Sequence, residues 1–219
     1  MFMVGPWPKA LSSSALASKS VNFADIVRSR RMSRSFSDQA VDPAVITSCI
    51  ELATRAPSAG KSQGWHVLIL ENESTQRYWD VALTPERREG FAFPLLLKAP
   101  VIVISMCDPT AYLERYSEPD KKATGLGESL EKWPAPYWTI DASFATMTFL
   151  LALQDVKLGA LFFAHSNEAG LRQEFNIPDH IEILGTIAIG HEAAGLNPQG
   201  RSAKRIRRSV ESVIHQKNW

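Results

Sequence analysis

The stretch Val101-Ile102-Val103-Ile104-Ser105 decides the fold class of this chain of 219 residues. Four consecutive β-branched residues favour a strand, and successive side chains of a strand point to opposite faces of its sheet. Because this stretch is apolar on both faces, we expect it to be covered on both sides. It therefore predicts the central strand of the sheet on which the domain is built.

Three further strands are predicted on either side of it in the sequence. Trp65 to Leu70 precedes it, and Leu161 to Ala164 forms a short strand after it. Ile183 to Ile189 is a strong apolar run that ends at Gly190. Together with helical segments between them, these strands indicate one α+β domain.

Helix starts are marked by capping residues. Asn22 with Asp25 opens a first helix, and Asp42 followed by Pro43 opens a second one that ends before the turn formers at 56–60. Shorter helices are expected near Ser74 to Val81 and from about Asn167 to Phe175.

The segment from Ile140 to Leu158 is apolar nearly all round, which predicts a helix buried in the domain or at a subunit interface. Residues 108–136 contain many Pro, Gly and charged residues without clear periodicity, so we expect a long connecting excursion. Its aromatic side chains would suit a lid over a flat substrate, or equally packing at a dimer surface. These aromatic residues are Tyr112, Tyr116, Trp133, Tyr137 and Trp138.

Composition excludes several classes of protein. With 45% hydrophobic and 21% charged residues and a net charge of +1, the chain fits a globular protein that binds neither nucleic acid nor a membrane. Its longest apolar stretch, 144–153, is too short to cross a bilayer. We expect a flexible arm over residues 1–20 and a single domain over 21–219. Cys49 and Cys107 are expected to be buried thiols, which favours the cytoplasm.

Motifs for nucleophilic, nucleotide-loop and metal-dependent catalysis are absent, and the five histidines have no metal-ligand spacing. Positive charge is instead concentrated near the two ends of the domain. If the fold brings these clusters together, they form a phosphate clamp; otherwise each is a solvated helix end or a weak nucleic-acid patch. The clusters are Arg28, Arg30, Arg31 and Arg34, and Arg201, Lys204, Arg205, Arg207 and Arg208.

The loop from Pro57 to Gln63 is the second candidate site. Its small residues would let backbone N–H groups approach a planar ligand, although a plain helix-to-strand turn explains them as well.

Five motifs occur in a characteristic order along the chain. They are Arg30-Arg31-x-x-Arg34-x-Phe36, Ala56-Pro57-Ser58-Ala59-Gly60-x-x-Gln63-x-Trp65, Leu158-Gly159, Ile189-Gly190, and a basic segment before Val213. In this order and spacing the chain resembles the nitroreductase family of FMN-dependent oxidoreductases, from about residue 22 onward. The resemblance implies a central, mostly antiparallel sheet flanked by helices in an intertwined homodimer.

The resemblance also implies which residues contact FMN. The phosphate and ribityl chain are assigned to Arg30, Arg31, Met32 and Arg34, together with Arg205 and Arg207 from the late basic segment. The loop of the other subunit would contribute Pro57, Ser58, Ala59 and Lys61. The strand after Gly159 would bring Phe163, Ala164 and His165 to the N5 edge of the isoalloxazine.

Three positions depart from the family pattern. Lys61 stands where an asparagine is common, Gly64 replaces a frequent proline, and no asparagine follows near Phe91. Lys61 could stabilise the negative charge of the reduced flavin near N1 and O2 and thereby raise its potential. The alternative is a surface lysine that points away.

The implied activity is transfer of hydride from NAD(P)H through flavin N5 to a small electron-poor acceptor, a nitroaromatic or a quinone, by a ping-pong mechanism. No metal and no catalytic side chain is required, because the flavin carries the chemistry. The alternatives are a flavin-dependent reductive dehalogenase, a flavin-consuming enzyme of the same family, or a non-catalytic flavin-binding protein.

Overall fold

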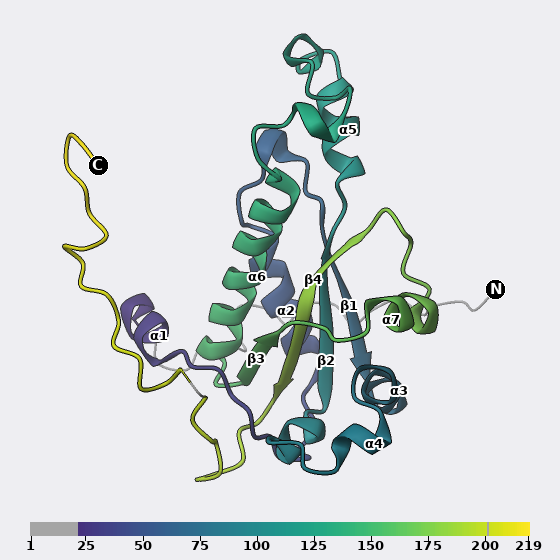
Figure 1. Cartoon of the computed structure of the whole chain (residues 1–219), viewed down its shortest axis with the longest axis vertical. Helices are drawn as coiled ribbons and strands as arrows, with labels where there is room; N and C mark the ends of the chain where they lie inside the picture. Colours follow the sequence, from purple (N-terminus) through teal and green to yellow (C-terminus); the bar gives the residue numbers. More distant parts are fainter. Residues whose placement is uncertain (1–21, 201) are drawn as a thin grey trace.

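The computed structural model describes residues 22–200 and 202–219. The arm expected over residues 1–20 lies outside this part of the chain. Four antiparallel strands form one sheet in the order β1-β2-β4-β3 (Figure 1). They are β1 (Trp65–Glu71), β2 (Val101–Cys107), β3 (Gly159–Phe163) and β4 (Glu182–Gly190). The four predicted strands are therefore confirmed.

The side chains of β2 are divided between two hydrophobic layers. Val101 and Val103 pack with α2 (Pro43–Ala53) and α6 (Tyr137–Asp155). Ile102 and Ile104 pack with α3 (Glu73–Ala82) and α7 (Glu168–Phe175) on the other face. Every residue of β2 is buried, as predicted for a central strand with helices on both sides (Figure 1).

Polar side chains cap the starts of the predicted helices, where they accept hydrogen bonds from backbone N–H groups that have no partner within the helix. Asn22 accepts from Ala24 N at 2.9 Å at the start of α1 (Phe23–Ser29). Asp42 accepts from Ala44 N at 2.8 Å at the start of α2. The apolar helix predicted over 140–158 is α6, which begins and ends about three residues earlier than expected.

The segment 108–136 differs from the excursion that we expected, because it contains regular structure. It forms α5 (Thr110–Ser117) and the 3₁₀ turns η4 (Lys122–Thr124) and η5 (Leu130–Lys132). The signal for α5 is the pair Asp108-Pro109, since Asp108 accepts from Thr110 N at 2.7 Å. Its aromatic residues form a core of their own, in which Tyr112, Trp133 and Trp138 are buried.

The remaining elements are short. They are η2 (Ala59–Lys61), α4 (Pro85–Arg88) and η3 (Pro94–Lys98). Residues 202–219 contain no helix or strand and are exposed throughout, and this segment extends away from the sheet (Figure 1).

Two general expectations can be compared with the described residues. Cys49 and Cys107 are buried free thiols, as predicted, and burial raises the pKa of each to about 12. None of the helices in 22–200 and 202–219 combines the length and the hydrophobicity that a membrane span needs.

Candidate functional site

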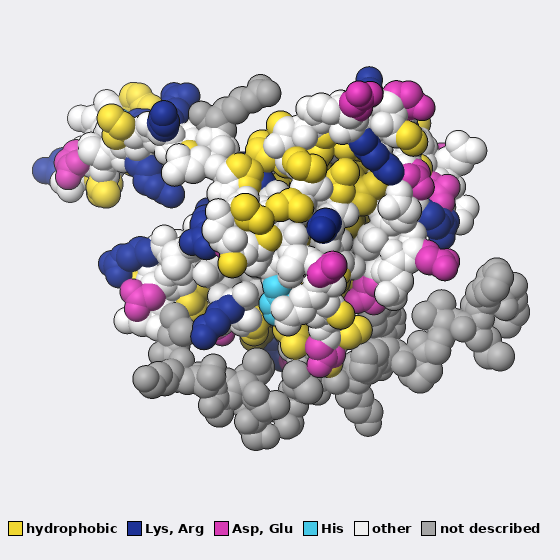
Figure 2. Space-filling view, turned by 90° about the horizontal axis from the view of Figure 1, so that it is seen from below, with side chains coloured by type: hydrophobic (Ala, Val, Ile, Leu, Met, Phe, Trp, Pro, Cys, Tyr) yellow, Lys and Arg dark blue, Asp and Glu magenta, His cyan; other side chains and the backbone are white. Residues whose placement is uncertain are grey.

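A hollow of about 860 Å³ lies at the end of the sheet where β3 begins and β4 ends. Its volume is within the usual range for a small-molecule site. Two segments far apart in the sequence line it, one around residues 30–34 and the other between residues 192 and 207. Lys and Arg side chains lie along one side of the molecule at this end, beside a patch of hydrophobic ones (Figure 2).

The fold fixes the first of these segments against the second. Met32 forms a parallel bridge with Ala160 of β3, and Phe36 forms an antiparallel bridge with Glu192. Phe36 is fully buried in the core, so it anchors the segment beside the sheet. Arginines from distant parts of the sequence therefore line one hollow, namely Arg30, Arg31, Arg34 and Arg207.

Arg34 connects the two segments directly. Its backbone N–H donates to Asn197 Oδ1 at 2.8 Å, and its guanidinium lies over the ring of Phe93 at 5.6 Å. Gly200 packs against that guanidinium, since a Cβ at this position would lie 2.8 Å from Arg34 Nη2. A side chain at residue 200 would therefore displace the guanidinium.

Glu192 is an acidic residue in this basic hollow. Its carboxylate accepts from Arg31 Nη2 at 2.6 Å and from the Ser33 hydroxyl. Burial on its own raises the pKa of Glu192, but the two hydrogen bonds outweigh burial and hold the pKa below its ordinary value. Arg31 is therefore partly neutralised. Among the described residues, no carboxylate forms an ion pair with Arg30, Arg34 or Arg207.

The contact between Arg31 and Glu192 predicts a pH-dependent stability. A lowered carboxyl pKa stabilises the folded state above the ordinary glutamate value of about 4.3, and this stabilisation is lost as the pH falls through the folded-state pKa. We expect Glu192→Gln to reduce the free energy of unfolding by about 1 kcal/mol at pH 7, because the pair is partly exposed. In urea unfolding, the difference from the parent should shrink as the pH falls below the ordinary glutamate value. A difference that does not change with pH would contradict this account, and Glu89→Gln, at an exposed residue just after α4, is the control.

The three residues expected at the flavin N5 edge begin with Phe163, the last residue of β3, which leads away from the hollow. The ring of Phe163 stacks on Trp79, with centroids 6.0 Å apart and planes within 1°. Ala164 is exposed, and His165 is half-buried.

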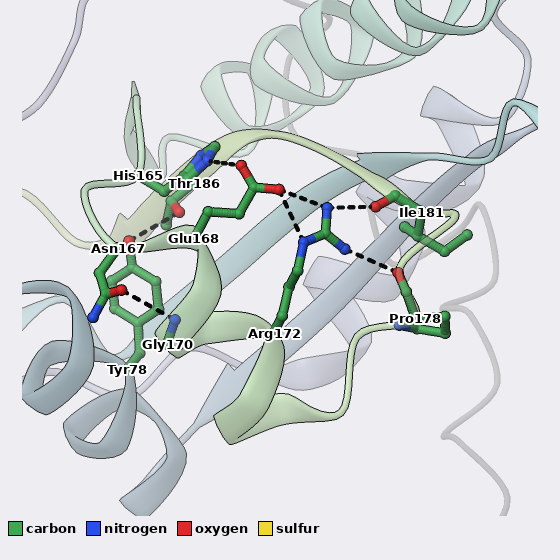
Figure 3. A network of polar contacts seen from close by, with 9 residues as sticks. All are labelled: Tyr78, His165, Asn167, Glu168, Gly170, Arg172, Pro178, Ile181 and Thr186. Atoms are coloured by element: carbon green, nitrogen blue, oxygen red, sulfur yellow. Dashed lines mark hydrogen bonds and ion pairs between the residues drawn. The ribbon is translucent and has the colours of Figure 1, made fainter.

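A hydrogen-bonded chain fixes the imidazole of His165 (Figure 3). His165 Nε2 lies 2.9 Å from Glu168 Oε2, and Arg172 donates to the other oxygen of Glu168. These contacts, from His165 first and Arg172 second, lower the pKa of Glu168, so its carboxylate is ionised at neutral pH. Arg172 also donates to the carbonyl oxygens of Pro178 and Ile181, at 2.9 and 2.8 Å.

The turn that contains Pro57, Ser58, Ala59 and Lys61 lies at the opposite end of the sheet. Trp65, which follows it, pairs with Cys107, whereas the hollow adjoins the Gly159–Gly190 pair. A strand of seven residues spans roughly 20 Å. Within one chain, this turn and the arginine hollow therefore cannot belong to one site.

The predicted site residues thus form three groups. The hollow contains Arg30, Arg31, Met32, Arg34 and Arg207, but Arg205 is not among the residues that line it. Phe163, Ala164 and His165 form the second group, and the turn forms the third. The sequence did not identify Glu192, Asn197 and Gly200, although Asn197-Pro198 followed by Gly200 is a turn signal that could have directed attention to this segment.

The fold and the hollow define an α+β protein with a cationic site at one end of an antiparallel sheet. The model of the nitroreductase family matches residues 27–191 of the chain. The chain therefore belongs to the nitroreductase family, as its motifs predicted, and this assigns it to the oxidoreductases.

Two relatives support this assignment, and a solved structure supports the fold. A 4-nitrobenzoate reductase from Nocardioides sp. is 28% identical over an aligned length of 200 residues, and the match covers 78% of this chain and 81% of the relative. A Methanothermobacter thermautotrophicus protein whose name combines NADH dehydrogenase and NAD(P)H nitroreductase is 26% identical over 174 residues, 77% of this chain and 76% of the relative. A structure from Exiguobacterium sibiricum, solved in complex with FMN, has a TM-score of 0.70 at 16% identity and covers 91% of this chain and 99% of its own. The last confirms the fold.

Proposed function

We propose that this protein binds FMN non-covalently as a homodimer and passes reducing equivalents from NAD(P)H to a small electron-poor acceptor, a nitroaromatic or a quinone. Residues 21–219 form its single FMN-binding domain in this proposal. The observation that carries the proposal is that arginines from both ends of the domain line one hollow. The planar guanidinium group suits bidentate binding of phosphate.

The charge of the hollow fits a phosphate monoester. Its charged lining residues are four arginines and Glu192, which leaves an excess of three positive charges. A phosphate monoester carries a charge of about −1.5 to −2 at neutral pH. Because Glu192 already holds Arg31, we assign the direct phosphate contacts mainly to Arg30, Arg34 and Arg207, with Met32 beside the ribityl chain.

Bound at this site, FMN would supply the two-electron chemistry between NAD(P)H and the acceptor, which predicts ping-pong kinetics in a shared pocket. The chain then has to bind the flavin, orient it and exclude water. Phe163, Ala164 and His165 are placed beside the ring in this proposal because β3 leads to them from the hollow. The side chains of Phe163 and His165 are held by Trp79 and Glu168, respectively, which suits an orienting role.

Two observations support a homodimer with the flavin at the interface. The turn at 57–61 cannot reach the hollow of its own chain, so if both belong to one flavin site, a second copy supplies the turn. In addition, Leu52 of α2 and Phe144 and Met147 of α6 are 52%, 48% and 41% exposed in the single chain. Large apolar side chains grouped on neighbouring helices are typical of a surface that a partner covers.

The C-terminal segment agrees with this arrangement. Its apolar side chains have no core of their own to pack against, and a second copy would cover them. They are Ile206, Val210, Val213, Ile214 and Trp219, with exposures between 55% and 100%. We place the protein in the cytoplasm, because both cysteines are free thiols and cytosolic thiols are kept reduced.

The absorbance spectrum of the purified protein tests the proposed function. A yellow protein whose flavin is bleached by NADPH and recovers its colour with a nitroaromatic is the expected result. A colourless protein that retards oligonucleotides at low salt would overturn it. A yellow protein that neither NADH nor NADPH bleaches would favour a non-catalytic flavin-binding role.

Lys61 provides a more specific prediction. Its side chain is exposed on the turn and is free to approach a flavin held by a second copy. A cation near N1 and O2 stabilises the reduced flavin, so Lys61→Ala is expected to lower the midpoint potential of bound FMN. Lys122→Ala, at an exposed lysine of η4, should leave it unchanged. A redox titration with reference dyes measures both variants, and identical potentials in Lys61→Ala and the parent would remove Lys61 from the site.

A further inference from the structure

Asp141, near the start of α6, is a buried carboxylate that none of the roles above explains. It is 7% exposed. Its Oδ2 accepts a hydrogen bond from Ala59 N at 2.7 Å and another from the Tyr112 hydroxyl at 2.8 Å. Neither donor is charged, so a buried anion is held without a positive partner within reach in the described structure. Burial of a carboxylate is costly unless its oxygens are hydrogen-bonded or paired with a cation, so the stability of this arrangement depends on the two donors.

The two donors belong to different segments of the chain. Ala59 begins the η2 turn, and Tyr112 lies on α5. Asp141 also lines a cavity of about 100 Å³ together with Pro57, Ser58 and Tyr112. One carboxylate oxygen therefore connects the central helix, the turn and the excursion at the same end of the sheet.

A second group of contacts from α5 reaches the same turn. Arg115 Nε donates to the carbonyl oxygen of Gly60 at 2.8 Å, and Arg115 is itself held by two bonds of 2.8 Å to Asp120. The ring of Tyr116 packs on Gly60 so closely that a Cβ there would lie 2.7 Å from it. The turn is therefore supported by α5 on one side and by Asp141 on the other.

The conformation of the turn requires this support. Lys61 and Gln63 have φ angles of +60° and +56°, in the left-handed region that costs most residues other than glycine about 1 kcal/mol. Such conformations persist where the surrounding structure imposes them, and they are frequent at functional sites. One local hydrogen bond, from Gln63 N to Ser58 Oγ at 3.1 Å, also contributes.

The aromatic core of the excursion makes the support rigid. Tyr112 packs edge-on against Trp133 with centroids 5.6 Å apart, and against Trp138 at 6.4 Å. Burial first, and the hydrogen bond to Asp141 second, raise the pKa of Tyr112, so its hydroxyl remains a donor over the whole working pH range. The segment whose aromatic residues could have formed either a lid or a dimer surface therefore also supports the turn.

We infer that Asp141 is a positioning residue, which holds the η2 turn in the strained conformation that presents Pro57, Ser58 and Lys61 to the flavin of a second copy. The contact with the flavin rests on the proposed function. The fixing of the turn rests only on the hydrogen bonds of Asp141 and on the contacts of Arg115 and Tyr116.

Asp141→Asn tests the inference, because it preserves the size of the side chain and removes its charge. We expect amide hydrogen exchange in a peptide covering residues 58–64 to become about tenfold faster, because a neutral amide oxygen is a weaker acceptor than a carboxylate. Tyr112→Phe keeps the bond to Ala59 and should give a smaller increase. Asp155→Asn, at the other end of α6, is the matched control and should exchange like the parent.

A flavin measurement separates positioning from a general loss of stability. If Asp141 places Lys61, then Lys61→Ala should lower the FMN midpoint potential in the parent and have no further effect in Asp141→Asn. Unchanged exchange in folded Asp141→Asn overturns the inference, even in a yellow protein. Should Asp141→Asn fail to fold, Arg115→Gln removes the other hydrogen bond to the turn and must give the same faster exchange. A colourless parent would defeat the proposed function and still leave the exchange test valid.

Discussion

Replacement of Arg34 by alanine is expected to yield a folded protein that binds FMN about a hundredfold more weakly and purifies without colour. Arg34 is the arginine that both lining segments fix, through Asn197, Gly200 and the ring of Phe93. Loss of one partner from a hydrogen-bonded charge pair in a binding site costs about 2–5 kcal/mol, and each 1.4 kcal/mol is a factor of ten. The effect should therefore exceed that of any other single arginine.

Titration of the apoprotein with FMN, followed by quenching of flavin fluorescence, measures this loss. Arg28→Ala is the matched control, since Arg28 lies on α1 outside the hollow and pairs with the neighbouring Asp25 at 3.6 Å. Thermal unfolding of the apoproteins shows whether either variant is generally destabilised. Stoichiometric FMN in Arg34→Ala would mean that the hollow is not the phosphate site.

The sequence predicted the sheet and most helices because their signals are local. The alternation of β2 between two apolar layers follows from five consecutive residues, and Asp42-Pro43 caps its own helix. The α5 helix carries a similar signal at Asp108-Pro109, but it is only eight residues long, too short for a periodic pattern to develop. Its contacts with η2 involve residues about 55 positions away, which a local pattern does not contain.

The candidate site could be predicted only in part for the same reason. The sequence indicated that two arginine clusters could converge, and the structure places Arg30, Arg31, Arg34 and Arg207 around one hollow. No sequence pattern pointed to Glu192, because Arg31, the partner of Glu192, is 161 positions away. Arg205 and Arg207 could not be distinguished beforehand, since 202–219 has no helical or strand period that would give a residue a direction.

The arginine hollow and the η2 turn lie at opposite ends of the sheet in one chain, so the proposed function makes the dimer the smallest active unit. One chain provides an arginine hollow at one end of its sheet and an η2 turn at the other. In a two-fold symmetric dimer the same pair of surfaces meets twice, so each of two sites receives its hollow from one copy and its turn from the other. A defect in the hollow and a defect in the turn should therefore complement each other when they lie in different chains.

We expect mixed dimers of Arg34→Ala and Pro57→Trp to regain activity that neither variant has alone. Pro57 is exposed on the turn, so a tryptophan there leaves its own chain folded and fills the space of the flavin ring in the partner's site. In a mixed dimer one site carries both defects and the other carries neither. Random exchange of subunits makes half of the dimers mixed, so NADPH-dependent nitroaromatic reduction should recover to about a quarter of the parent value.

The experiment is done by mixing the two purified variants under mild denaturant, dialysing with FMN and following activity and flavin absorbance together. Asp179→Trp replaces Pro57→Trp in the control mixture, because Asp179 is exposed in a loop outside both groups of site residues and this variant should be active by itself. If each site lay within one chain, every mixed dimer would contain one site with each defect, and no mixture would recover activity. Recovery therefore requires that the hollow of one copy and the turn of the other meet at one flavin.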